Sequence, residues 1–218
     1  MPFHRFLIDC EYVLIAVSAI TGLVRYQKMK TELRYVVYFV WLGGFTEILN
    51  VFYRSFLFKN NMPIGHFYIP FSILIFSFMY KRLLAGFLNK YIFNLLILFF
   101  VLFAVINPVF LQSLWEFPNV LGAVGALMLI VFSILYYGRM MTEGKINRFA
   151  NNPLAWINSL VLFYYTGNFF FYILFNLNVE NSIEFAQLST RLYLILNLLL
   201  YLFTAYILLI VDRKNSYL

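Results

Sequence analysis

The feature that most constrains this chain is a series of seven long apolar stretches separated by short polar breaks. A bilayer core about 30 Å thick requires about 20 largely apolar residues in a helix, with a working range of about 17 to 25. Backbone polar groups find no water inside a bilayer, so each such stretch must be helical. The sequence therefore predicts an all-α membrane protein of seven transmembrane helices. The predicted helices cover residues 7–24, 35–56, 65–84, 91–110, 120–137, 154–175 and 185–211.

Composition supports a membrane environment and excludes other classes of protein. Hydrophobic residues make up 63% of the 218 residues and charged residues only 11%, against about 25% charged in an ordinary soluble domain. The net charge is +7, but Lys and Arg are spread over short breaks and form no dense basic tract. We therefore expect membrane lipid as a partner and no nucleic acid.

The breaks between the predicted helices are all short. They cover residues 25–34, 59–63, 86–90, 112–118, 138–153 and 176–184. Segments of this length have no room for a folded domain of their own. The chain is therefore predicted to be a single transmembrane domain over residues 1–218.

The positions of Lys and Arg predict the orientation, because cytoplasmic loops retain positive charge. Twelve of the 16 Lys and Arg residues fall in the first, third and fifth breaks, at the ends of the helices beside them, or after the last helix. These are Arg25, Lys28, Lys30, Arg34, Lys81, Arg82, Lys90, Arg139, Lys145, Arg148, Arg213 and Lys214. The opposite side holds only Arg5, Arg54, Lys59 and Arg191. We therefore expect the N-terminus outside and the C-terminus in the cytoplasm.

A weak internal similarity suggests a duplicated three-helix unit. Residues 28–32 resemble residues 139–143, and the aromatic-Thr pair at 45–46 recurs at 165–166. These traces favour a 3+1+3 parallel repeat of residues 7–84 and 120–211, with residues 91–110 as the connecting helix. The alternative is that both matches arise by chance in a sequence of low diversity.

Polar residues concentrate in the predicted outer half of the bundle. Ionisable groups at bilayer depth cost roughly 2.5 to 3.5 kcal/mol, so they normally face the interior or a water-filled cavity. Glu47 lies about 18 Å above the cytoplasmic end of its helix, and the helical spacing puts Asn50 and Arg54 on the same face. We predict a polar pocket with eight ligand-binding candidates. They are Glu47, Asn50, Arg54, His66, Tyr68, Asn168, Arg191 and Asn197.

The alternative is that these residues serve packing alone. Glu47 could form a buried ion pair with Arg54 or Arg191, and Asp9 and Glu11 could lie in interfacial water. His66, near the predicted membrane edge, is also typical of an interfacial hydrogen-bonding residue.

The sequence offers little material for catalysis. Cys10 is the single cysteine and there are two histidines, which leaves little material for a metal cluster or a nucleophile-base pair. A retinal chromophore would need a lysine in the last helix, and residues 192–211 contain none. We expect no catalytic residue, no metal and no cofactor, and an intramembrane enzyme such as a lipid hydrolase is the least favoured of the alternatives.

Four short segments resemble a group of small bacterial membrane proteins that each consist of one seven-helix unit. They are the Thr-Glu pair at 46–47, the His-Phe-Tyr-Ile-Pro run at 66–70, and the segments at 152–157 and 165–169. The resemblance implies the helix count and a bacterial cytoplasmic (inner) membrane, and it implies no activity. Similar proteins often carry an acidic residue soon after the proline, where this chain has Phe71 and Ser72. The outline is also similar to 3+1+3 sugar facilitators of the SWEET and PQ-loop type, although the chain has no Pro-Gln pair.

These features favour a sensor or receptor-type protein that binds a small ligand from outside and signals through a partner membrane or signalling protein. One alternative is a SWEET-like carrier, which needs no partner and would expose the same pocket to both faces in turn. A further alternative is a structural subunit of a membrane complex, in which the buried polar residues only hold helices together.

Overall fold

The computed structural model is all-helical and describes every residue except 1, 58–59, 146–148, 150, 182 and 211–218. Seven helices are long and apolar enough to cross a membrane, which confirms the predicted helix count and an integral membrane protein. The α-helices are α1 Pro2–Arg25, α2 Thr31–Phe52, α3 Met62–Leu83, α4 Lys90–Ile106, α5 Asn119–Thr142, α6 Pro153–Asn181 and α7 Ile183–Ile210. Short helical turns η1 Tyr26–Lys28, η2 Tyr53–Leu57 and η3 Asn107–Leu111 extend α1, α2 and α4.

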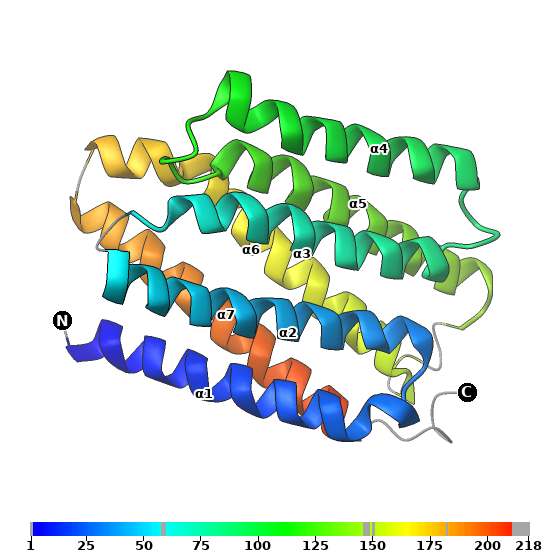
Figure 1. Cartoon of the computed structure of the whole chain (residues 1–218). Coiled ribbons are helices and arrows are strands. Elements are labelled where there is room, and N and C mark those ends of the chain that lie inside the picture. The colour runs from blue at the N-terminus through cyan, green and yellow to red at the C-terminus, as the bar shows by residue number, and fades with distance from the viewer. Residues whose placement is uncertain (1, 58–59, 146–148, 150, 182, 211–218) are drawn as a thin grey trace.

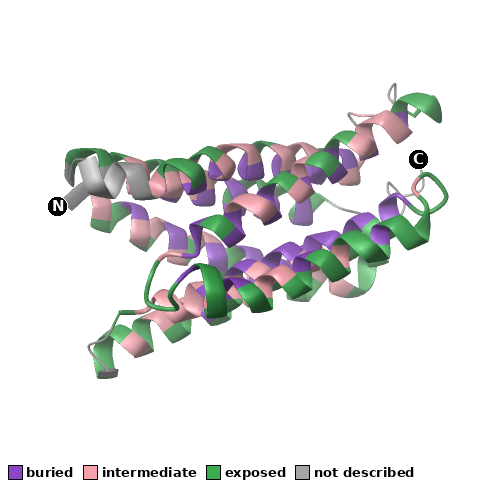
Figure 2. Ribbon diagram, turned by 90° about the horizontal axis from the view of Figure 1, so that it is seen from above, coloured by how far each residue is buried: buried purple, intermediate pink, exposed green. Residues whose placement is uncertain are grey.

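The principal contacts link six of the helices in a closed ring, and the helices run side by side along the bundle, with α4 at its upper edge (Figure 1). Going round the ring, the principal contacts join α1 to α2, α2 to α3, α3 to α5, α5 to α6, α6 to α7, and α7 back to α1. Helix α4 lies outside this ring against α3 and α5, and it buries only Phe93 and Phe100. Buried surfaces face the middle of the bundle and exposed surfaces face outward (Figure 2).

The prediction of a loop over residues 176–184 is wrong. Helix α6 continues to Asn181 and α7 already begins at Ile183, so all the described residues of this stretch are helical. The physical reason is that the segment contains no proline and no glycine to end a helix. The predicted C-terminal limit at residue 211 lies outside the described residues, as do Lys59, Arg148, Arg213 and Lys214.

The other breaks end helices by ordinary turn chemistry. Gly86 and Gly144 adopt φ values of 82° and 66° after α3 and α5, a conformation that costs glycine no steric strain. The Asn89 side chain accepts a hydrogen bond from the Tyr91 backbone N–H at 2.9 Å and caps α4. Pro153 opens α6, where its missing N–H costs nothing, and the Asn152 side chain accepts from the Leu154 N–H at 3.0 Å.

A layer of four aromatic side chains fills the middle of the ring. We call Phe39, Phe76, Tyr165 and Tyr201, from α2, α3, α6 and α7, the aromatic layer; each is at most 3% exposed. The Phe76 ring lies 4.8 Å from Phe39 and 5.9 Å from Tyr165, and Phe39 stacks on Tyr201 at 6.1 Å between centroids. Edge-to-face and offset ring pairs of this kind stabilise packing beyond the area they bury.

Beside this layer, a buried hydrogen-bond network joins three helices. The Tyr80 hydroxyl donates to the Asn158 Oδ1 at 2.7 Å and lies 2.6 Å from the Ser133 Oγ. The Asn158 Nδ2 donates to the Ser133 carbonyl oxygen at 3.2 Å. Because each of these groups has partners from another helix, the network fixes α3, α5 and α6 relative to one another.

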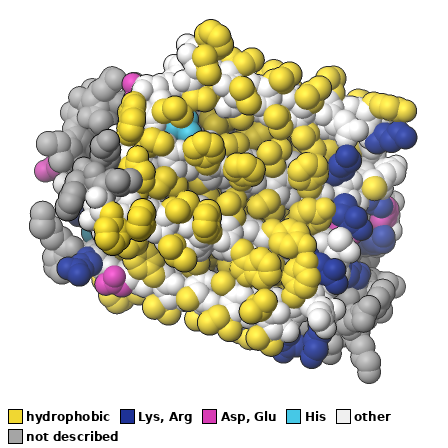
Figure 3. Space-filling model, viewed as in Figure 1, with side chains coloured by type: hydrophobic (Ala, Val, Ile, Leu, Met, Phe, Trp, Pro, Cys, Tyr) yellow, Lys and Arg dark blue, Asp and Glu magenta, His cyan; other side chains and the backbone are white. Residues whose placement is uncertain are grey.

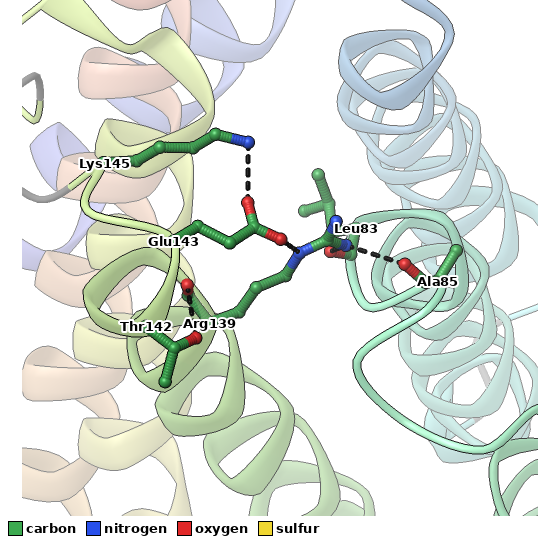
Figure 4. A network of polar contacts seen from close by, with 6 residues as sticks. All are labelled: Leu83, Ala85, Arg139, Thr142, Glu143 and Lys145. Atoms are coloured by element: carbon green, nitrogen blue, oxygen red, sulfur yellow. Dashed lines mark hydrogen bonds and ion pairs between the residues drawn. The ribbon is translucent and has the colours of Figure 1, made fainter.

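The two ends of the bundle differ in charge. Lys and Arg side chains gather at the end where α1 finishes and α5 finishes, and hydrophobic side chains cover the middle of the visible face (Figure 3). At this basic end, Arg139 of α5 donates to the carbonyl oxygens of Leu83 and Ala85 at 2.6 and 3.0 Å and pairs with Glu143 at 2.6 Å (Figure 4). These bonds attach the end of α5 to the turn between α3 and α4.

Glu143 is held as a carboxylate at this end. Lys145 and Arg139 donate hydrogen bonds to its two oxygens, each at 2.6 Å, and these bonds lower the pKa of the Glu143 carboxyl below its ordinary value of 4.5. Glu143 follows the last residue of α5 and lies outside the membrane-spanning segments.

Candidate functional site

A cavity of about 360 Å³ lies within the ring, in the half of the bundle where α1 begins. That volume is near the lower end of the 300–1,000 Å³ usual for small-molecule sites. Helices α1, α2, α3 and α7 supply most of the lining, and Phe117 before α5 and Phe171 and Phe175 of α6 close one side. Tyr201 of the aromatic layer forms part of the wall, so the cavity ends against that layer.

Five of the eight residues predicted from the sequence line this cavity. They are Glu47, Asn50, Arg54, Tyr68 and Asn197. They come from three separate helices and the turn η2, so the fold brings together residues that lie far apart in the chain. Their role in ligand binding stays a prediction.

The other three predicted residues lie outside the lining set. The buried His66 has its Nε2 3.0 Å from the Glu116 carbonyl oxygen, which holds the segment before α5 against α3. Asn168 is fully buried and donates to the Tyr164 carbonyl oxygen one turn earlier in α6, at 2.9 Å. Arg191 is half-buried on α7. The geometry therefore gives His66 and Asn168 contacts that support local packing.

Glu11 is the most important lining residue that the sequence-based list omits. It is 7% exposed, and its Oε1 accepts a hydrogen bond from the Asn197 Nδ2 at 2.9 Å. The Asn197 Oδ1 in turn accepts from the Tyr164 hydroxyl at 2.8 Å. A signal for Glu11 was present in the sequence, because it follows Leu7 and precedes Ile15 at the i, i+4 spacing that places all three on one helix face.

A second carboxylate, Glu47, lies in the same cavity. Its Oε1 is 3.4 Å from the Asn50 Nδ2, a long hydrogen bond, and the Asn50 Oδ1 accepts from the Asn61 Nδ2 at 2.9 Å. Among the residues that the structure describes, no ion pair joins Glu11 or Glu47 to a basic side chain. The hypothesis of a Glu47 ion pair with Arg54 or Arg191 therefore has no contact that supports it.

The floor of the cavity depends on a glycine. Gly43 of α2 lies against the Tyr201 hydroxyl, and a Cβ at this position would overlap it. Small residues at such points allow helices in a membrane to approach closely. Gly43 therefore lets α7 bring Tyr201 to α2 and close the base of the cavity.

Chemically, the cavity offers two carboxylates, amide groups and tyrosine hydroxyls, with Arg54 and His4 also in its lining. This set can bind a cationic group and donate or accept several hydrogen bonds. No group of three or more His, Cys, Asp and Glu able to hold a metal ion occurs in the described part of the chain.

The fold and the cavity define the class of this molecule as a polytopic membrane protein, a seven-helix bundle with a polar, ligand-sized cavity inside it. Comparisons with protein-family models, with curated protein sequences and with solved structures found no match to this chain. The resemblance to small bacterial seven-helix proteins and to SWEET-type facilitators accordingly stays a prediction.

Proposed function

We propose that this protein is a receptor-type membrane sensor that binds a small ligand with a cationic group in the cavity between α1, α2, α3 and α7. The observation that carries the proposal is the pair of carboxylates, Glu11 and Glu47, that line one cavity with Arg54 and form no salt bridge with it or with any other basic side chain among the described residues. A buried charge without a partner is costly. A cationic ligand would supply the missing charge to both.

The packing below the cavity supports sensing rather than passage through the bundle. The aromatic layer contributes four side chains that are each at most 3% exposed. A ligand that enters from the end where α1 begins would meet this layer and could move α2 and α7 against each other. A partner protein at the other end, either a membrane protein or a signalling protein, would respond to that movement.

We assign the N-terminus to the outside and the C-terminus to the cytoplasm, in a bacterial inner membrane. The distribution of Lys and Arg supports this orientation, since basic side chains gather at the end opposite the cavity (Figure 3). In this orientation the cavity belongs to the outer half, and a ligand reaches it from outside the cell.

A carrier related in outline to the SWEET type is the second candidate, and the ring favours it. The order α1, α2, α3, α5, α6, α7 lets a two-fold axis along the bundle exchange the first three helices with the last three. Local contacts agree with such a 3+1+3 repeat. Tyr80 of α3 meets Ser133 of α5, while the Ser18 hydroxyl of α1 donates to the Tyr201 carbonyl oxygen of α7 at 2.9 Å. In a carrier, the aromatic layer would be a gate that opens.

Thiol accessibility from each face separates the two candidates. In a Cys10→Ser background, Thr46→Cys places a thiol in the cavity wall, and an impermeant reagent is applied to right-side-out and inside-out vesicles. Ser113→Cys and Thr142→Cys, both at exposed positions near opposite ends of the bundle, report the orientation. We expect outside labelling of residues 46 and 113 and inside labelling of residue 142.

The other outcomes are equally informative. Labelling of residue 46 from both faces would contradict the sensor and support the carrier. Absence of labelling at residue 46, with both exposed controls labelled, would contradict any open cavity and favour a structural subunit of a membrane complex. Inside labelling of residue 113 together with outside labelling of residue 142 would contradict the proposed orientation and support the opposite one.

A further inference from the structure

A second hollow adjoins the polar cavity on the lipid-facing side of the bundle. This lateral groove lies between α1 and α2 and has a volume of about 430 Å³. It is lined by Tyr12, Ile15, Ala16, Ala19, Gly44, Glu47, Ile48 and Val51. Apart from Tyr12 and Glu47 its walls are entirely apolar, and Ile48 and Val51 are 69% and 48% exposed toward the side where lipid would lie.

The groove and the cavity share two wall residues. Tyr12 and Glu47 line both hollows, so they form the partition between a polar space inside the ring and an apolar space outside it. A carboxylate is unusual in the wall of a lipid-facing groove, since a charge at bilayer depth costs free energy. A molecule with a charged end and an apolar end would match both sides of this partition.

From this juxtaposition we propose that the ligand is a single-chain amphiphile with an amine head. The head lies in the cavity against Glu11 and Glu47, and the alkyl chain passes between α1 and α2 into the lateral groove. The inference rests on the proposed function, because it names the ligand of the same cavity. It adds that the ligand enters sideways from the bilayer.

Charge and length select this occupant. The two carboxylates outnumber Arg54 in the lining and therefore favour a cation over an anion or a neutral sugar. The apolar groove gives a hydrocarbon chain a place that a fully polar ligand would leave empty. The groove follows α1 from Tyr12 to Ala19, a rise of about 10 Å. An extended chain of roughly eight carbons spans that length.

Another groove on the surface provides an internal comparison. The hollow between α6 and α7 has a volume of about 290 Å³ and is lined by Trp156, Ser159, Leu160, Phe163, Leu199, Phe203 and Ile207. It has no ionisable residue and shares no residue with the polar cavity. A hydrocarbon chain could lie there only as ordinary bilayer lipid does, without a head-group site.

The test measures protection of the cavity thiol by amines of increasing chain length. Proteoliposomes contain the full chain with Cys10→Ser and Thr46→Cys, and ethylamine, butylamine, octylamine and dodecylamine compete with the thiol reagent. We expect octylamine to protect at about a tenfold lower concentration than ethylamine, because its chain is buried in the groove. The gain should level off beyond eight carbons, whereas partition into bulk lipid continues to increase with chain length.

Two substitutions by phenylalanine, one inside the lateral groove and one outside it, serve as a matched pair. Ala16→Phe fills the groove at an exposed position, and Val131→Phe adds the same ring to the exposed surface of α5. Ala16→Phe should abolish the advantage of octylamine over ethylamine and leave ethylamine protection unchanged. Val131→Phe should leave both unchanged. An unaltered labelling rate without amine shows that each variant keeps its cavity.

Different results would contradict the proposed function, the amine head and the lateral groove. If residue 46 is not labelled from any face before amines are added, the proposed function itself is contradicted. If it is labelled but no amine protects it, or if Glu47→Gln leaves protection unchanged, the cavity stands and the amine class is wrong. If ethylamine protects as well as octylamine, or if the chain-length gain survives Ala16→Phe, the lateral groove has no part in binding.

Discussion

Buried polar side chains in the two halves of the bundle have different kinds of surroundings. In the half where α1 finishes, Tyr80, Ser133 and Asn158 satisfy one another across three helices. In the half where α1 begins, Glu11 and Glu47 line a cavity and accept hydrogen bonds from Asn197 and Asn50, and neither forms a salt bridge among the residues described. The contrast teaches that Tyr80, Ser133 and Asn158 form a network closed by protein groups, whereas Glu11 and Glu47 border a cavity that we propose to be a ligand site.

The largest expected loss of stability follows from a substitution in the aromatic layer, which separates the two halves. Phe76→Ala deletes a side chain of the aromatic layer that is 1% exposed and contacts Phe39 and Tyr165. We expect a loss of about 3 kcal/mol in the free energy of unfolding, because a void remains where the ring packed. Unfolding in mild detergent, followed by circular dichroism against denaturant, measures this loss.

Phe67→Ala is the matched control on the same helix, since Phe67 is 65% exposed. Its effect should stay within about 0.5 kcal/mol. Equal losses in the two variants would mean that the layer is no more important for stability than the lipid-facing surface.

The next effect concerns the floor of the cavity. Gly43→Ala would place a Cβ on the Tyr201 hydroxyl, and we expect a destabilisation of about 1 to 3 kcal/mol from the forced shift. Gly44→Ala is its neighbour and control, because there the Cβ would meet Ile15 Cγ2 at 3.3 Å, a contact that a small movement relieves. Thermal unfolding of both variants decides the matter, and an unchanged melting temperature in Gly43→Ala would show that Tyr201 moves freely.

A third change tests whether Glu11 belongs to a hydrogen-bonded unit. Glu11→Ala leaves the Asn197 Nδ2 without its acceptor and should cost about 1 to 3 kcal/mol. Glu11→Gln keeps an acceptor and should cost less in the free energy of unfolding, while it removes a charge that a cationic ligand needs. Asp9→Ala, at an exposed position on the same helix, should change neither stability nor ligand binding.

The order of these variants in denaturant unfolding is the measurement for Glu11. A Glu11→Gln variant as unstable as Glu11→Ala would contradict the hydrogen-bond account. An Asp9→Ala variant with the same effect as Glu11→Ala would show that overall charge at this end, and not the contact with Asn197, matters.

The sequence predicts the helices well because the hydrocarbon core imposes length and apolarity on every span. It predicts five of the cavity residues because polar side chains at bilayer depth are rare and their helical phase can be counted. The sequence alone does not single out Glu11, because this residue lies near the end of the predicted helix, where interfacial water is an equally good hydrogen-bond partner. Whether position 11 faces α7 or solvent depends on the closure of the ring, which links the first helix to the last.

Other parts were not predictable from local patterns. The polar residues at 176–184 suggested a loop, yet a polar segment without proline or glycine can remain helical. His66 and Asn168 have the depth expected of cavity residues, but the cavity lining does not include them: His66 lies against the Glu116 carbonyl oxygen, and Asn168 donates to the Tyr164 carbonyl oxygen of its own helix. The lateral groove could not be predicted, because its existence depends on the distance between the surfaces of α1 and α2, and the residue pattern of a single helix does not give that distance.

The smallest expected effect lies at the basic end, where Glu143 is exposed. Its pKa is lowered by the hydrogen bonds from Lys145 and Arg139, so the folded state favours the carboxylate. The stabilisation is therefore present above the ordinary pKa of 4.5 and is lost as the pH falls through the lower pKa of the folded state. Because these ion pairs are in contact with water, we expect a contribution under about 1 kcal/mol.

Glu143→Gln should consequently lower the melting temperature slightly at pH 7 and not at a pH below the folded pKa, where the parent carboxyl is also neutral. Glu116→Gln is the control, because Glu116 is exposed and bonds His66 through its backbone carbonyl. A loss in Glu143→Gln that is independent of pH would assign the effect to packing at the turn between α3 and α4. A loss that disappears at low pH means that the carboxylate of Glu143 orders Arg139, which holds the end of α5 to Leu83 and Ala85. The basic end would then be stabilised by ion pairs in contact with water, in contrast to the cavity, where Glu11 is buried, Glu47 is half-buried and neither forms a salt bridge among the described residues.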